Sequence, residues 1–174
     1  MIKRPALAMA TLALSLCAAA CGWAKPAPGA VEDVAPATEA CGPQPGKLPR
    51  ENLQVKTDKG PRHFDVEIAA TDLSREYGLM CRPKMTDHHG MLFEFATPAE
   101  QTFWMKNTYI PLDIIYIDKA GRIVSIARNA KPFDETPLPS FGPATGVLEI
   151  NGGLADRLGI KPGDQVDHRF FSSH

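Results

Sequence analysis

The stretch at residues 78–118 constrains the fold most, because it concentrates large apolar side chains that must be buried together. It contains the motifs GLMCRP, GMLFEF and FWMKNTYIPLDIIYID in quick succession. Its last part, residues 112–117, is apolar apart from one Asp, and such a run is typical of a strand that is covered on both faces. We therefore expect the core of the protein to form around this strand.

Short runs of alternating apolar and β-branched residues indicate strands throughout the second part of the chain. They lie at residues 53–57, 63–69, 91–95, 102–106, 112–117, 122–127, 147–150 and 166–171. Short helices are expected at residues 71–77, which Thr71 or Asp72 can cap and Gly78 can end, and at residues 154–158. Residues 131–146 hold four prolines and are expected to form an irregular loop. The pattern predicts a mainly β domain, a jelly-roll-like sandwich or barrel of seven or eight short strands with two short helices.

The N-terminal part of the chain has the composition of an export signal. Lys3 and Arg4 precede an apolar segment at residues 6–20, which is too short for a comfortable membrane span. We therefore expect residues 1–20 to be a signal peptide and the protein to be periplasmic, attached to the outer membrane, or secreted. Residues 21–50 are rich in Pro and Ala, which indicates a flexible tether before a single domain at residues 51–174.

The cysteines support two further hypotheses. Cys21 follows three alanines and is a candidate for lipidation, which would provide the only membrane contact, although ordinary signal cleavage is an alternative. Cys41 and Cys81 would then remain as thiols, an even number in an oxidising compartment. We expect these two to form a disulfide, with free thiols or pairing to another chain as the alternatives.

Charge and motif content exclude several classes of function. The net charge is −1, and no basic stripe is present, so nucleic acid is not an expected partner. The sequence contains no G-x-S-x-G, no H-E-x-x-H and no phosphate-binding Gly-rich loop. We therefore predict no catalytic residues and no cofactor.

Six motifs, GLMCRP, GMLFEF, FWMKNT, PLDIIYID, VLEINGG and LGIKPGD, resemble in order and spacing the pattern of domain-of-unknown-function family 192. This is a family of small, often exported bacterial and archaeal proteins, and the resemblance covers residues 66–166. It implies a mainly β, jelly-roll-like fold but no established activity. The positions that match the pattern are Gly78, Met80, Gly90, Met91, Trp104, Met105, Asn107, Leu112, Asp113 and Glu149, whereas Cys81 departs from it.

The polar residues among the apolar strands are the candidate ligand site: Trp104, Lys106, Asn107, Asp113 and Glu149. A charge is costly to bury unless it is paired or hydrogen-bonded, so these side chains need a reason to be there. A flat indole beside amide and carboxyl groups suits a small polar ligand such as a sugar. The alternative is that Asp113 and Asn107 hold the loop at residues 107–111 through backbone amides. We expect a non-enzymatic binding or accessory module of the cell envelope, with a small polar ligand or a protein as its partner.

Two other functions remain open at this point. A small glycan-directed hydrolase would use Asp113 and Glu149 as its acids, which requires the two carboxyls to face each other about 5–10 Å apart. A copper-binding protein would use the soft ligands Met80, His88, His89 and Met91, which must then converge on one point.

Overall fold

The computed structural model describes residues 46–172. The expected signal peptide, the lipidation site Cys21, most of the tether and Cys41 lie outside the described residues. Within them, no helix has the length and apolar character needed to cross a membrane. The elements follow in the order β1 (Arg50–Thr57), β2 (Gly60–Ala69), α1 (Asp72–Tyr77), β3 (His89–Phe103), β4 (Leu112–Ile117), β5 (Ile123–Ala130), β6 (Leu138–Asn151), α2 (Leu154–Leu158), β7 (Gln165–Asp167) and α3 (Arg169–Ser172).

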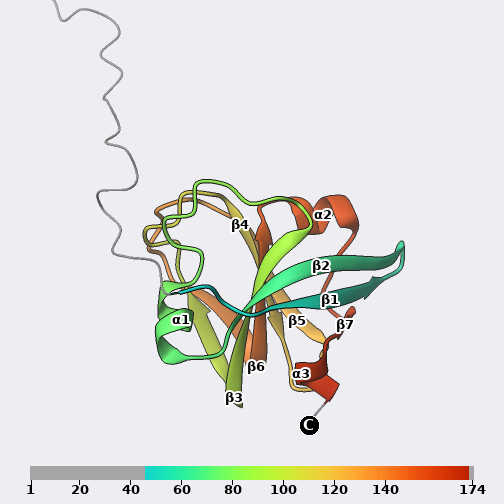
Figure 1. The fold of residues 1–174 in the computed structure, drawn as a ribbon. Coiled ribbons are helices and arrows are strands. Elements are labelled where there is room, and N and C mark those ends of the chain that lie inside the picture. The colour runs from blue at the N-terminus through green and yellow to red at the C-terminus, as the bar shows by residue number, and fades with distance from the viewer. Residues whose placement is uncertain (1–45, 173–174) are drawn as a thin grey trace, which may run out of the picture. The chain divides into compact units, whose positions relative to one another are not determined.

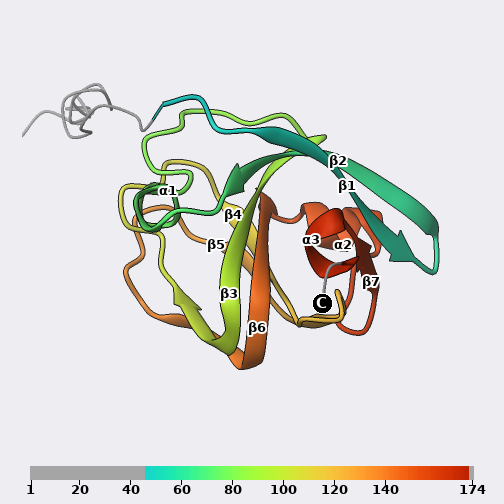
Figure 2. The same cartoon turned by 60° about the horizontal axis from the view of Figure 1, so that its bottom comes forward.

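These strands form one sheet in the order β5-β4-β6-β3-β2-β1-β7, which curls into a half-barrel (Figures 1 and 2). β2 and β3 run parallel, and the other neighbours are antiparallel. The two edges approach each other, because the Ile123 N–H donates to the Asp164 carbonyl over 2.9 Å and the Val166 N–H donates to the Gly121 carbonyl over 2.7 Å. The expected mainly β fold is confirmed.

The sheet is covered on both faces, and β4 shows this most clearly. All six of its residues are buried. Successive side chains of a strand point to opposite faces, so Ile115 and Ile117 belong to one apolar cluster, with Leu148 and Ile150, and Ile114 and Tyr116 to the other. The expectation of a central strand covered on both faces is confirmed. A polar side chain on β4, or on the buried part of β6 at residues 144–150, therefore lies in a largely apolar layer.

Helix α1 lies where the sequence predicted a short helix, and it begins and ends at the expected residues. Thr71 and Ser74 form a capping box, in which the Thr71 side chain accepts from the Ser74 N–H and the Ser74 hydroxyl accepts from the Thr71 N–H. Gly78 ends the helix at a φ of 52°. A Cβ at Gly78 would lie 3.2 Å from the Phe93 ring, so the glycine lets the helix end pack closely on β3.

Three predicted boundaries are wrong. The runs at residues 91–95 and 102–106 belong to one long strand, β3, which ends at Phe103. The expected loop at residues 131–146 becomes strand from Leu138 onwards, because register shifts between β3 and β6 accommodate its prolines. The expected last strand ends at Asp167, and a helical turn follows, in which the Phe171 N–H donates to the His168 carbonyl over 3.0 Å.

Candidate functional site

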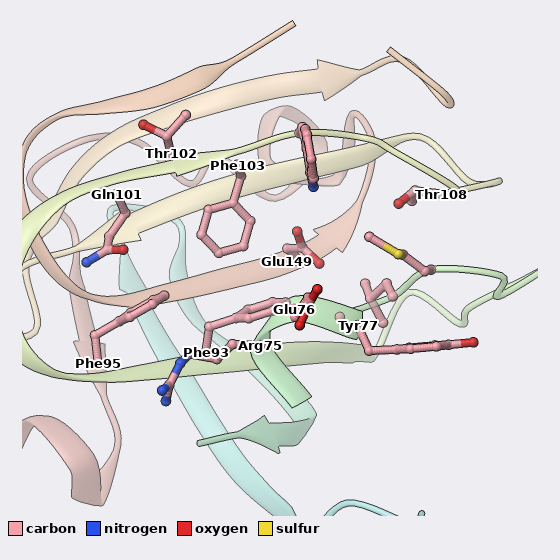
Figure 3. A pocket seen from close by; sticks show the side chains of 14 residues that line it. Arg75, Glu76, Tyr77, Phe93, Phe95, Gln101, Thr102, Phe103, Thr108 and Glu149 are labelled. Carbon is pink, nitrogen blue, oxygen red and sulfur yellow. The ribbon is translucent and has the colours of Figure 1, made fainter. Parts of the chain in front are cut away.

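A pocket of about 190 Å³ lies between α1, β3, β6 and the segment after β3 (Figure 3). It is smaller than the roughly 300–1,000 Å³ of sites for drug-sized ligands, so it suits a small molecule. Helix α1 contributes Arg75, Glu76 and Tyr77, and β6 contributes Glu149. Trp104 and Thr108 follow β3 and complete the lining on the opposite side. The pocket is therefore built from segments far apart in the sequence.

Glu149 is the most unusual group in this pocket. Its residue is only 4% exposed, yet within residues 46–172 no hydrogen bond or ion pair reaches its carboxyl group. Burial raises the pKa of Glu149 to about 8, because a low-dielectric environment disfavours the charged form. Figure 3 shows the carboxyl group in the pocket between the Phe103 ring and the α1 residues Glu76 and Tyr77. The Glu149 carboxyl group therefore lines the pocket and is not engaged by the described part of the fold.

Aromatic rings form much of the surrounding wall. Phe93 and Phe103 pack edge to face, with ring centroids 5.0 Å apart, which is a favoured geometry for aromatic pairs. Tyr77 and Trp104 also line the pocket, and Trp104 is 49% exposed, so its indole lies at the entrance. The pocket therefore combines an apolar, aromatic wall with one buried carboxyl group.

Arg75 also lines the pocket, but its guanidinium group is already engaged. It donates to the carbonyl oxygens of Ala70, over 2.6 Å, and Glu94, over 2.8 Å, and it pairs with Asp72. It also stacks over the Phe95 ring, 5.3 Å from its centroid. These partners hold Arg75 at the margin, and no ion pair joins it to Glu149 within the described part of the chain.

The loops beside the pocket are tied to one another by backbone hydrogen bonds. The Cys81 N–H donates to the Asn107 carbonyl over 2.8 Å, and the Phe133 N–H donates to the Met105 carbonyl over 3.1 Å. Cys81, Asn107 and Phe133 all have positive φ, between 51° and 63°, a conformation that costs energy for residues other than glycine and that concentrates at functional sites. The loops that follow α1 and β3, next to the lining residues Met80 and Thr108, are therefore held in a defined but strained conformation.

The structure brings together only part of the predicted ligand site. Trp104 and Glu149 line the same pocket, and the Lys106 ammonium group lies over the Trp104 ring, 5.2 Å from its centroid. Asn107 has a positive φ in the loop after β3 and does not line the pocket itself. Asp113 does not share their environment, because it pairs in register with Ile150 and so points to the other face of the sheet from Glu149.

Asp113 is an anchor for the backbone. Its carboxylate accepts hydrogen bonds from the N–H groups of Asn129, over 2.7 Å, of Gly153, over 3.0 Å, and of Ala155, over 2.7 Å. These donors belong to β5 and to the start of α2, not to the loop at residues 107–111 that the alternative interpretation assigned to it. Asp113 is therefore corrected from a candidate ligand residue to a structural acid.

The hydrolase hypothesis fails on this geometry. Ile114, not Asp113, is the register partner of Glu149 on β4. Ile114 and Ile150 belong to different apolar clusters, one on each face of the sheet. The two acids consequently lie on opposite sides of the sheet and do not face each other across a cleft, as paired glycosidase acids must.

The four soft ligands that we considered for copper do not converge. Met91 is buried in the core, Met80 lines the pocket, and His88 is exposed. The His89 Nε2 lies 2.8 Å from a Glu67 carboxylate oxygen. In residues 46–172 no group of three or more His, Cys, Asp or Glu side chains is arranged to hold a metal ion.

Cys81 takes part in a disulfide, as expected. The partner that we predicted for it, Cys41, lies outside the described residues, so the pairing itself stays a prediction.

Sequence reasoning missed the α1 side of the pocket. Glu76 and Tyr77 gave no signal, because both stand in an ordinary polar segment of the sequence. The available clue was Gly78, whose place at the helix end permits the close packing of α1 on β3. Only this packing brings the side chains of the helix to Glu149.

Comparison with known proteins agrees with this fold. The family model described as "Uncharacterized ACR" (DUF192) matches residues 53–168. A protein of unknown function from Novosphingobium aromaticivorans DSM 12444 is 47% identical, with 76% of this chain and 96% of that chain covered and a TM-score of 0.69. A candidate transcription regulator from Sinorhizobium meliloti 1021 is 38% identical, with 73% and 99% covered and a TM-score of 0.70. A comparison with curated proteins finds no match.

Proposed function

The chain belongs to domain-of-unknown-function family 192, and we propose that it is a non-enzymatic binding module that takes up a small polar ligand in the pocket above Glu149. The observation that carries this proposal is the buried, unpartnered carboxyl group of Glu149. A buried polar group without a hydrogen bond destabilises the fold. Groups that are kept at such a cost are commonly functional.

The pocket also supplies the other features of a binding site. It is concave, and it combines aromatic side chains with polar ones, which can fix the orientation of a small ligand. The backbone around it is tied down before any ligand arrives, because the loops of Cys81, Asn107 and Phe133 are fastened together. Such preorganisation lowers the entropic cost of binding.

The place of action is part of the same proposal. Residues 1–20 have the composition of a signal peptide, and Cys21 is a candidate lipid attachment site. A Pro- and Ala-rich tether at residues 21–50 would then separate the binding domain from the membrane. We propose a role in the bacterial cell envelope, where the module would meet small molecules from the surroundings.

The test is a screen of small water-soluble fragments of positive, negative and zero charge against the full chain, in which changes of amide chemical shifts report binding. We expect shifts at Glu149 and Thr108, and at least a tenfold loss of affinity in a Trp104→Ala variant, which removes one wall. Phe141→Ala is the matched control, since Phe141 is 80% exposed and does not line the pocket. The proposal fails if fragments of every charge leave these amides unshifted, or if both variants bind equally well.

A further inference from the structure

The geometry points to a small organic ammonium ion as the ligand of the Glu149 pocket, an inference that rests on the proposed function and specifies its ligand class. An ammonium group would donate its N–H groups to the Glu149 carboxylate while its alkyl part lies against the aromatic wall. Hydrogen bonds to charged groups are stronger than those between neutral groups, most of all where water is excluded.

The charges around the pocket favour a positive ligand. The charged residues that line it are Arg75 and Glu76 on α1 and Glu149 on β6, and β3 contributes none. The Arg75 guanidinium group is engaged with Asp72 and with the carbonyl oxygens of Ala70 and Glu94. Within residues 46–172, no ion pair compensates either Glu76 or Glu149. A cation would therefore meet two acids that no ion pair compensates, while Arg75, the base that lines the pocket, is engaged by other partners.

The aromatic wall is also suited to a cation. Tyr77, Phe93, Phe103 and Trp104 line the pocket, and aromatic rings attract alkylammonium groups through the negative potential of their faces. The molecule already contains one such contact, because the Lys106 ammonium group lies 5.2 Å from the centroid of the Trp104 ring. Aromatic side chains that surround a cationic group are used in the recognition of ammonium ligands.

Ammonium binding has a definite pH dependence. The carboxyl group of Glu149 releases its proton to solvent, and the ammonium group then pairs with the carboxylate. With a pKa of about 8, the ionised fraction of Glu149 rises about fifty-fold between pH 6 and pH 8, and the apparent affinity rises by the same factor. Other titratable groups near Glu149 are Arg75, Glu76 and Tyr77 on α1, and Tyr116 on β4.

The experiment measures binding of n-butylammonium chloride to the full chain at pH 6, 7 and 8, with 1-butanol and butyrate as neutral and anionic probes of the same length. We expect n-butylammonium to bind at least tenfold more tightly than the other two at pH 8, with an affinity that rises about fifty-fold from pH 6. Glu149→Gln should remove both the preference and the pH dependence. Glu76→Gln is the control, and it should weaken binding only two- to threefold and keep the pH dependence.

The outcomes separate this inference from the proposed function. If 1-butanol or butyrate shifts the pocket amides as strongly as n-butylammonium does, the pocket binds small molecules but the ammonium class is wrong. If n-butylammonium binds with an affinity that is unchanged by pH or by Glu149→Gln, its site is elsewhere and the inference is also wrong. If no fragment of any charge binds, the proposed function itself fails.

Discussion

Asp113 and Glu149 are both buried acids on neighbouring strands, one step apart in register, and their surroundings differ completely. Asp113 accepts three backbone hydrogen bonds on one face of the sheet. Glu149 has no partner among the described residues and lies at a pocket on the other face. The difference shows that burial alone does not identify a functional acid. What distinguishes the two is whether the fold satisfies the carboxyl group.

The largest expected effect comes from the unsatisfied acid. Because the pKa of Glu149 is raised from 4.5 to about 8, the folded chain keeps a proton that the unfolded chain loses between these pH values. Stability should therefore fall as the pH rises from 4.5 to 8, by about 5 kcal/mol. Denaturant unfolding of the full chain and of Glu149→Gln at a series of pH values measures this term. If the unfolding free energy changes with pH to the same extent in both proteins above pH 5, Glu149 is not the unsatisfied acid that distinguishes it from Asp113.

Glu67 provides the opposite case, a partly buried acid with charged partners. Burial acts to raise its pKa, but hydrogen bonds from Arg82 and His89 outweigh it and lower the pKa from 4.5 to about 2. The folded chain is then deprotonated where the unfolded chain is protonated, so stability should be lost as the pH falls from about 4.5 to 2. We expect a loss of about 3 kcal/mol that is absent in Glu67→Gln. Asp65→Asn, at a half-exposed acid that pairs with Arg50, should retain most of it.

A smaller effect is expected for Asp113→Asn. The amide retains one acceptor oxygen but brings an NH₂ group toward backbone N–H donors, so we expect a loss of about 2 kcal/mol or more of unfolding free energy at pH 7. Asp156→Asn is the matched control, because Asp156 is 69% exposed and pairs with Arg128 on the surface, where such pairs contribute about 0–1 kcal/mol. Equal losses in the two variants would show that Asp113 is not the anchor that its contacts indicate.

The sequence predicted the individual strands better than the way they meet. The apolar run at residues 112–117 predicts a strand covered on both faces. Alternation correctly places Asp113 on the same face of this strand as Ile115 and Ile117. Alternation does not say which face of β4 continues which face of β6, because that depends on register. The register pairs Ile114 with Glu149, and this separates the two acids that we had grouped in one site.

Only some residues of the candidate site could be predicted from the sequence, because the others depend on how the elements pack. Trp104 and Glu149 stand out as residues that need an explanation within apolar strands. Glu76 and Tyr77 do not, because a short polar helix is unremarkable until its packing on Phe93 is known. The prolines at residues 139 and 143 similarly suggested a loop, since the register shifts that admit them to β6 are a property of its pairing with β3.

The most direct test is a pH titration of the Glu149 side chain in the full chain, in which the chemical shift of its carboxyl carbon is the signal. We expect a midpoint near pH 8, which moves to lower pH when n-butylammonium is added. A midpoint near 4.5, unchanged by the amine, would show that the carboxyl group is solvated or satisfied within the fold. That result would contradict the claim that Glu149 is kept for a ligand.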